Sequence, residues 1–221
     1  MKEVFYLITI TQDMVNINSF ESEKRPTDII RTIFEKQSEL MKSYWTKPVW
    51  EDIDTLFGSQ EIRKFSKYTV EELAEAYQAM EIDWARWEHS EEEMIDSLHF
   101  FIEKLLIANL TYKKILGYLG TDSDNIRNLI KEKAESIKDW SIESLLRLAT
   151  YHSNIADNRL RNKERKEEQL PTNRDLFYKE SAEWFLKYLA AFYSLWLNEN
   201  KLRELYSRKN QVNQFRIKSN Y

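Results

Sequence analysis

The chain of 221 residues contains three glycines, three prolines and no cysteine. Glycine and proline form most turns, bulges and strand ends, so a chain poor in both favours long helices. The same scarcity argues against glycine-rich phosphate loops, nucleophile elbows and dinucleotide-binding fingerprints, which need glycines at fixed positions. Without cysteine the chain can form no disulfide, no thiolate metal site and no thiol nucleophile. We therefore expect an all-α protein that uses none of these devices.

Long hydrophobic runs are also missing. No stretch approaches 18 consecutive apolar residues, and Met1–Glu3 lack the basic region and cleavage site of a signal peptide. This pattern predicts a cytoplasmic protein with no membrane partner. The length suits one domain, and no repeat or low-complexity linker divides it. We predict a single helical domain over residues 1–221, with an N-terminal extension at 1–25 and a basic C-terminal tail at 209–221.

Apolar residues at helical spacing predict an antiparallel bundle of five or more helices. Val4–Thr11 is rich in β-branched and aromatic residues, so it fits either one short N-terminal strand or the start of a buried helix. Capping boxes (Thr69 with Glu72, Ser90 with Glu93) predict two helix starts, and Ser141 predicts another. Together these signals predict helices at Pro26–Tyr44, Thr69–Trp87, Ser90–Leu119, Thr121–Ser136, Ser141–Leu160 and Arg174–Leu197.

The last of these predicted helices carries an aromatic residue at every fourth position. Trp184, Tyr188, Phe192 and Trp196 fall on one side of it. This stripe is wider than a surface helix needs. It indicates either the central helix of the bundle or half of a dimer interface.

Charge is distributed unevenly along the chain. Residues 69–103 hold eleven acidic side chains against Arg86 alone, whereas residues 201–221 hold six basic side chains against Glu204. A second basic run lies at 159–166. Such asymmetry is compatible with solvated helix faces, with pairing between the acidic and basic segments, or with nucleic-acid binding.

The histidines do not complete a metal site. A two-metal carboxylate bundle needs an acidic residue three positions before a histidine on each of two helices, and only Asp96 and His99 meet this spacing. We therefore predict no metal and no cofactor. His99 is expected to be a core histidine hydrogen-bonded to a neighbour. His89 stands at a helix junction and is expected to be structural or exposed.

One motif points to a function. Arg147, four intervening residues and His152 are followed by Asn154, Asp157 and Asn158. This arrangement resembles the Arg-x4–6-His motif of the HEPN superfamily. The resemblance implies an all-helical antiparallel bundle that forms a homodimer and acts as a metal-independent endoribonuclease in a defence or toxin role.

In such an enzyme His152 would move protons and Arg147 would stabilise the charged transition state. Asn154, Asp157 and Asn158 would support them by orienting the imidazole or binding the RNA phosphate. On a regular helix Arg147 and His152 point about 140° apart, so a shared cleft would need a second copy across a two-fold axis. The alternative is a non-enzymatic module, an inactive relative that binds a protein partner, so catalytic activity stays open at this point.

Overall fold

The computed structural model describes residues 28–44, 51–82, 87–137, 141–163, 170–195 and 198–219. This part of the chain is helical and contains no strand, which confirms the predicted all-α class; Val4–Thr11 lies outside it. Its eight helices are α1 (Ile29–Tyr44), α2 (Leu56–Ile82), α3 (Trp87–Ile107), α4 (Tyr112–Leu119), α5 (Ile126–Glu135), α6 (Ile142–Arg159), α7 (Arg174–Ser194) and α8 (Glu199–Lys218).

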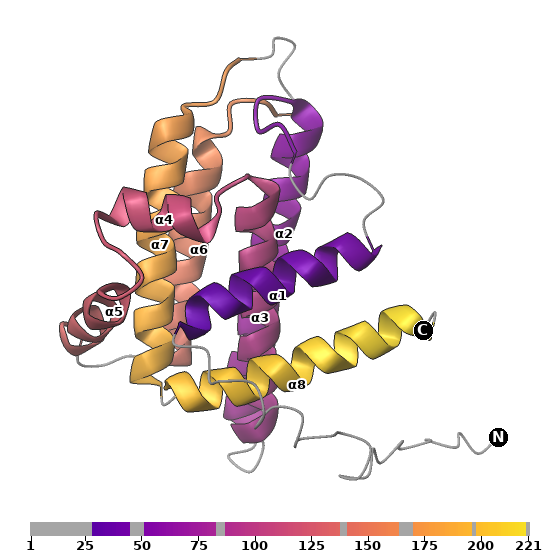
Figure 1. The fold of residues 1–221 in the computed structure, drawn as a ribbon, viewed down its shortest axis with the longest axis vertical. Helices are drawn as coiled ribbons and strands as arrows, with labels where there is room; N and C mark the ends of the chain where they lie inside the picture. The colour runs from indigo at the N-terminus through magenta and orange to yellow at the C-terminus, as the bar shows by residue number, and fades with distance from the viewer. Residues whose placement is uncertain are drawn as a thin grey trace.

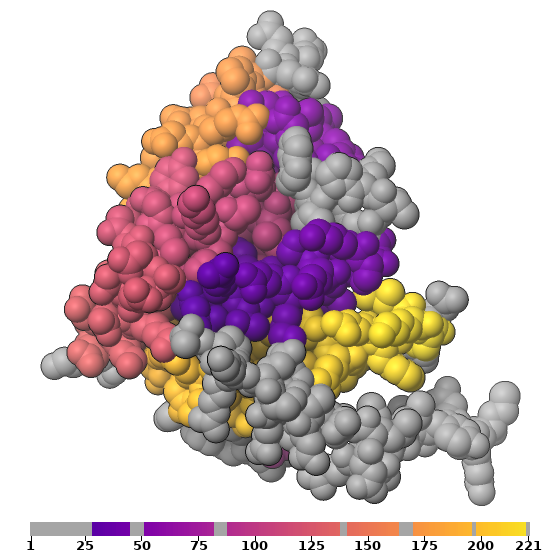
Figure 2. Space-filling view, in the orientation of Figure 1, coloured from indigo at the N-terminus to yellow at the C-terminus, as the bar shows by residue number. Residues whose placement is uncertain are grey.

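Four helices form the bundle. α2 packs on α3 and α6, and α6 packs on α7, so that these four lie side by side (Figure 1). α1 and α8 cross the bundle next to each other and both contact α3, while α4 and α5 cover α7. The space-filling view shows α1 between α8 and the α4–α5 segment on this face (Figure 2). No helix among the described residues combines the length and hydropathy needed to cross a bilayer.

The aromatic stripe of α7 belongs to the core. Trp184, Tyr188 and Phe192 are buried, and Phe101 of α3 lies against the first two with ring centroids 4.1 and 5.0 Å away. Aromatic rings provide the large apolar area that a bundle of this size must remove from water. Of the two alternatives for the stripe the core is therefore correct, and the fourth member, Trp196, lies outside the described residues.

The predicted helix start at Ser141 is confirmed, because its side chain accepts the backbone N–H of Ser144. The predicted start at Thr69 is wrong. Thr69 lies inside α2, is buried, and donates its hydroxyl hydrogen bond to the carbonyl of Phe65 one turn earlier. A threonine can satisfy its hydroxyl on the preceding turn of a helix, so the capping pattern alone does not mark a helix end.

The predicted helix Ser90–Leu119 is two helices. α3 already begins at Trp87, and Ser90 uses its hydroxyl to bind the carbonyl of Ala76 on α2. α3 ends before Asn109, whose φ of 58° is left-handed and cannot continue a right-handed helix. α4 then ends at Gly120, with φ 63°, as predicted for this glycine.

The C-terminal segment forms a helix that the sequence interpretation missed. Asn198 caps α8 by accepting the backbone N–H groups of Asn200 and Lys201. Residues 209–218 of the predicted basic tail are the last turns of this helix. Its buried side chains are few and lie mainly in its first half, so the apolar period is weak and charge dominates the sequence.

Candidate active site

Four carboxylates meet where α2 packs against α3. Glu72 and Glu75 lie three residues apart on α2, and Glu93 and Asp96 lie three residues apart on α3. Residues at this spacing share one face of a helix, so two helices packed side by side bring both pairs together. Carboxylate oxygens of Glu72, Glu75 and Glu93 lie within 4.8 Å of one another.

The carboxyl groups of the cluster shift the pKa of one of their members. Burial, followed by a hydrogen bond with Glu93 and the charges of Asp96, Glu93 and Glu75, raises the pKa of Glu72 to about 8. Among the described residues no basic side chain forms an ion pair with Glu72 or Glu75, while His89 Nδ1 lies 3.4 Å from Glu93 Oε1. Burial and the nearby like charges both disfavour the charged form of Glu72, so its protonated form is favoured at neutral pH.

α8 supplies basic side chains next to the cluster. Burial raises the pKa of Asp96, and the ammonium group of Lys209, which donates to Asp96 Oδ2, opposes this shift. Ion pairs between α8 and α3 also join Lys201 with Glu91 (3.1 Å) and Arg208 with Glu92 (3.0 Å). The acidic and basic segments of the sequence thus pair with each other, one of the three alternatives predicted for them.

A pocket of about 290 Å³ lies beside these ion pairs, between α3 and α8. Arg208, Lys209 and Arg216 line it together with Glu92. Three cations around one small hollow favour an anionic group there.

Two aromatic rings stand one helical turn from the cluster. Tyr68 lies four residues before Glu72, and Phe100 four residues after Asp96, so both share the face that carries the carboxylates. Their ring centroids are 5.2 Å apart, and both side chains are half-buried. This part of the α2–α3 seam offers apolar ring faces next to a charged centre.

His99 is buried, as predicted, but the predicted hydrogen bond is not found: within the described residues neither ring nitrogen has a partner. Its ring stacks on Tyr206 of α8 with centroids 4.3 Å apart. Burial, with a smaller contribution from the charge of Lys209, lowers the pKa of His99 to about 3. His99 is therefore a neutral packing residue of the α3–α8 contact. The exposed position expected for His89 is confirmed.

The structure does not bring Arg147 and His152 together. Arg147 is 78% exposed and forms an ion pair with Glu143 on its own helix. His152 faces α7, where its Nε2 lies 3.3 Å from Lys187 Nζ. Burial and then the charge of Lys187 lower the pKa of His152 to about 4. The two side chains diverge, as the five-residue spacing requires within a single helix.

The supporting residues of that motif line a groove of about 1420 Å³ between α2 and α6, where Arg147 also lies. Asp157 binds the buried ammonium group of Lys104 at 2.7 Å. Asn154 donates to the carbonyl of Thr150, and Asn158 accepts from Lys163. Each of these side chains is occupied in local structure.

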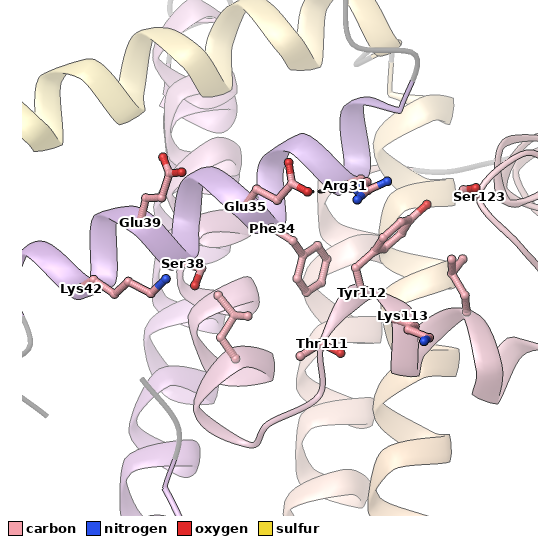
Figure 3. A pocket seen from close by; sticks show the side chains of 12 residues that line it. Arg31, Phe34, Glu35, Ser38, Glu39, Lys42, Thr111, Tyr112, Lys113 and Ser123 are labelled. Carbon is pink, nitrogen blue, oxygen red and sulfur yellow. Dashed lines mark hydrogen bonds and ion pairs between the residues drawn. The ribbon is translucent and has the colours of Figure 1, made fainter. Parts of the chain in front are cut away.

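A further hollow of about 510 Å³ lies between α1 and α4 (Figure 3). Phe34 and Tyr112 stand at its floor with ring centroids 5.8 Å apart, and Arg31 and Glu35 form an ion pair at its rim. The opposite charges at this rim neutralise each other. Glu39, Lys42 and Lys113 line it as well, so this hollow carries charges of both signs, whereas the α2–α3 cluster is wholly acidic.

Comparison with known families shows which family the chain belongs to. A family model described as dUTPase matches residues 81–221, more than half of the chain. The chain belongs to the dUTPase family. No curated protein and no solved structure matches it. The matched segment runs from the end of α2 through α8 and includes Glu93 and Asp96, while Glu72 and Glu75 lie just before it.

This membership overturns the HEPN interpretation. The ribonuclease function predicted from the Arg-x4–6-His spacing is wrong, and so is the alternative of an inactive HEPN relative. A short motif with one variable spacing matches unrelated helices easily. In this structure His152 is not among the residues that line the groove holding Arg147.

The carboxylate cluster did have a signal in the sequence. The expected metal-binding pattern, an acidic residue three positions before a histidine, leaves out acidic residues paired with each other. Glu72 with Glu75 and Glu93 with Asp96 are two such pairs at the same three-residue spacing. Both pairs lie in the most acidic part of the chain, where a solvated helix face was among the interpretations. Their convergence depends on α2 and α3 packing side by side, which the sequence does not state.

Proposed function

We propose that this protein hydrolyses a phosphoanhydride bond of dUTP, using the carboxylate cluster between α2 and α3 to hold a divalent cation. The observation that carries the proposal is the convergence of Glu72, Glu75 and Glu93 within 4.8 Å in a chain of the dUTPase family. Asp96, one turn beyond Glu93, extends the same face.

The donor set fits a hard divalent cation such as Mg²⁺, which prefers carboxylate oxygens. The raised pKa of Glu72 supports this, because it reflects a half-buried carboxyl group with other carboxylates close to it. A bound divalent ion supplies positive charge that stabilises phosphate oxygens and lowers the pKa of a coordinated water.

The remaining roles fall to side chains of α8 and of the α2–α3 seam. Arg208, Lys209 and Arg216 line the small pocket next to Asp96 and neutralise the charge of a triphosphate. Tyr68 and Phe100 offer ring faces to the uracil base, since a planar base gains by stacking on aromatic side chains.

The proposal is tested by incubating the purified protein with dUTP and Mg²⁺ and separating the nucleotide products by anion-exchange chromatography. We expect hydrolysis that stops in excess chelator and returns when Mg²⁺ is restored. dTTP and UTP serve as comparison substrates and should react more slowly. Absence of dUTP hydrolysis at any Mg²⁺ or Mn²⁺ concentration would reject the proposed function.

We further propose that the protein works as a homodimer in the cytoplasm, with α6 near the interface. The support is the groove between α2 and α6, where Val70, Leu146 and Ile155 provide apolar surface and Tyr151 is 62% exposed. Light scattering should give the mass of two chains, and Tyr151→Lys should lower it towards one chain. A monomer at tens of micromolar would contradict the dimer.

A further inference from the structure

One ion pair connects the carboxylate cluster to the C-terminal helix. Lys209 donates to Asp96 Oδ2, and the two side chains are only 24% and 18% exposed. Asp96 stands on the same face of α3 as Glu93, so this ammonium group sits at the edge of the cluster. Among the described residues, Lys209 is the basic side chain that forms an ion pair with Asp96.

The anchoring of α8 on the bundle does not depend on this ion pair. One turn earlier, Tyr206 stacks on His99 and donates its hydroxyl to Gln37 Oε1 on α1 at 2.6 Å. Leu202 and Leu205 are also buried in this half of the helix, whereas none of residues 211–219 is buried. Lys209 thus lies where the packed half of α8 gives way to the exposed half, and its side chain can leave Asp96 without unfolding the helix.

We propose that Lys209 is an internal counter-ion that neutralises Asp96 in the cation-free protein and is displaced when a divalent cation binds the cluster. This inference rests on the function proposed above. The physical reason is that an ammonium group and a divalent cation on the same carboxylate repel each other strongly at such short range. Binding of the divalent cation must therefore break the contact between Lys209 and Asp96.

Displacement gives the two ligands an order. Once released, Lys209 can turn into the pocket that it shares with Arg208 and Arg216, where it adds one charge to the anion-binding surface. The nucleotide then meets this extra charge only after the divalent cation has bound. The arrangement predicts that cation binding precedes tight binding of the triphosphate.

The first test is calorimetric titration of the full chain with Mn²⁺, with Mg²⁺ as a second ion. Lys209→Met removes the competing charge and keeps most of the apolar stem, so it should tighten Mn²⁺ binding by about three- to tenfold. The matched control is Arg208→Met, because Arg208 pairs with Glu92 outside the cluster. We expect the control to change Mn²⁺ affinity by less than about twofold.

The second test needs no variant. Brief acetylation of the wild-type protein followed by mass spectrometry measures the accessibility of each lysine, and Mn²⁺ should increase the labelling of Lys209. Lys201, which pairs with Glu91, should label equally with and without the ion. Unchanged or weaker Mn²⁺ affinity in Lys209→Met, or a Lys209 that stays protected with Mn²⁺ bound, overturns the counter-ion role and leaves the proposed function standing. A wild-type protein that binds no divalent cation rejects both.

Discussion

Two regions of the molecule carry charged residues at short spacing on helices, and only one of them brings those residues together. On α2 and α3 the acidic residues are three apart, so each pair shares a helix face and the two faces meet in a cluster whose oxygens lie within 4.8 Å. On α6, Arg147 and His152 are five apart and contact opposite surroundings. The spacing of two residues on a helix therefore indicates a shared site only when it places both side chains on the same face.

The two regions also differ in how well their charges are satisfied. Arg147 pairs with Glu143 in solvent and costs the protein nothing. Glu72, by contrast, has its pKa raised to about 8 by burial and by neighbouring carboxylates. Perturbed pKa values concentrate at functional sites, so this shift supports the role proposed for the α2–α3 cluster.

The largest expected effect comes from removing charged or titratable side chains of each region in turn and comparing the rates of dUTP hydrolysis. Glu72→Gln should lower the rate of dUTP hydrolysis by about 10³-fold or more, because a cation charge in phosphoryl transfer contributes that much. His152→Ala and Arg147→Ala should leave the rate within about twofold. Steady-state kinetics at saturating Mg²⁺ measures all three.

A matched control for Glu72→Gln is Glu35→Gln, which removes the same charge from an exposed residue of α1 that pairs with Arg31. It should retain most of the activity. Equal losses in Glu72→Gln and Glu35→Gln would mean that overall charge, not the cluster, governs the reaction.

The second prediction concerns Asp157, which the sequence motif assigned to catalysis and the structure assigns to stability. Asp157→Ala leaves the ammonium group of Lys104, buried and 4.5 Å from the Trp184 ring, without its counter-ion. Breaking a buried ion pair costs about 3–5 kcal/mol, which lowers the Tm by about 6–20 °C in a chain of this size. Asn158→Ala, measured in the same thermal melts, should shift the Tm by less than about 2 °C. A small shift for Asp157→Ala would show that the ion pair is dispensable.

The third prediction uses the opposite pKa shifts of His99 and Glu72. His99 has a pKa of about 3 when folded, below its unfolded value, so its contribution to stability is lost as pH falls below about 6.5. Between pH 6.5 and 5 the free energy of unfolding should fall by about 2 kcal/mol more in the wild type than in His99→Phe, which keeps a ring against Tyr206.

Glu72 has a raised pKa, so its contribution to the free energy of unfolding is lost as pH rises from about 4.5 to 8. Saturating Mg²⁺ should suppress that loss.

Chemical denaturation across this pH range, with and without Mg²⁺, measures both slopes. In Glu72→Gln, Mg²⁺ should not change how the free energy of unfolding varies with pH between about 4.5 and 8. Parallel curves for the wild type and His99→Phe below pH 6.5 would contradict a neutral buried histidine.

The smallest expected effect distinguishes a true helix cap from an imitation. Ser141→Ala removes the hydrogen bond to the backbone N–H of Ser144 and should cost about 1 kcal/mol. Ser141→Asp, which can also accept that hydrogen bond, should restore most of the loss. Urea denaturation resolves a difference of this size. Equal stability of Ser141→Ala and the wild type would show that the Ser141 cap does not stabilise the protein.

Much of the fold was predictable, and the errors have local causes. Scarce glycine and proline, apolar periodicity and the Ser141 cap predicted the all-α class and four of the six helix starts to within a few residues. The capping patterns at Thr69 and Ser90 predicted the wrong helix starts because neither hydroxyl binds a free backbone amide at a helix end. The Thr69 hydroxyl donates to a carbonyl within α2, and the Ser90 hydroxyl, on α3, donates to a carbonyl of α2. α8 was missed because its apolar side chains are few.

Less of the site was predictable. Glu72, Glu75, Glu93 and Asp96 were visible as an acidic run, but an acidic run most often reflects a solvated helix face. The sequence by itself determined helical content, the aromatic core of α7 and which residues share a face, because these follow from backbone propensity and a 3.6-residue period. The packing of α2 on α3, and of α8 across α3, decided which faces meet. Long-range contacts between separate helices brought the carboxylates into a cluster and placed Lys209 beside it. Arg147 and His152 point in different directions because residues five apart on a straight helix do not share a face.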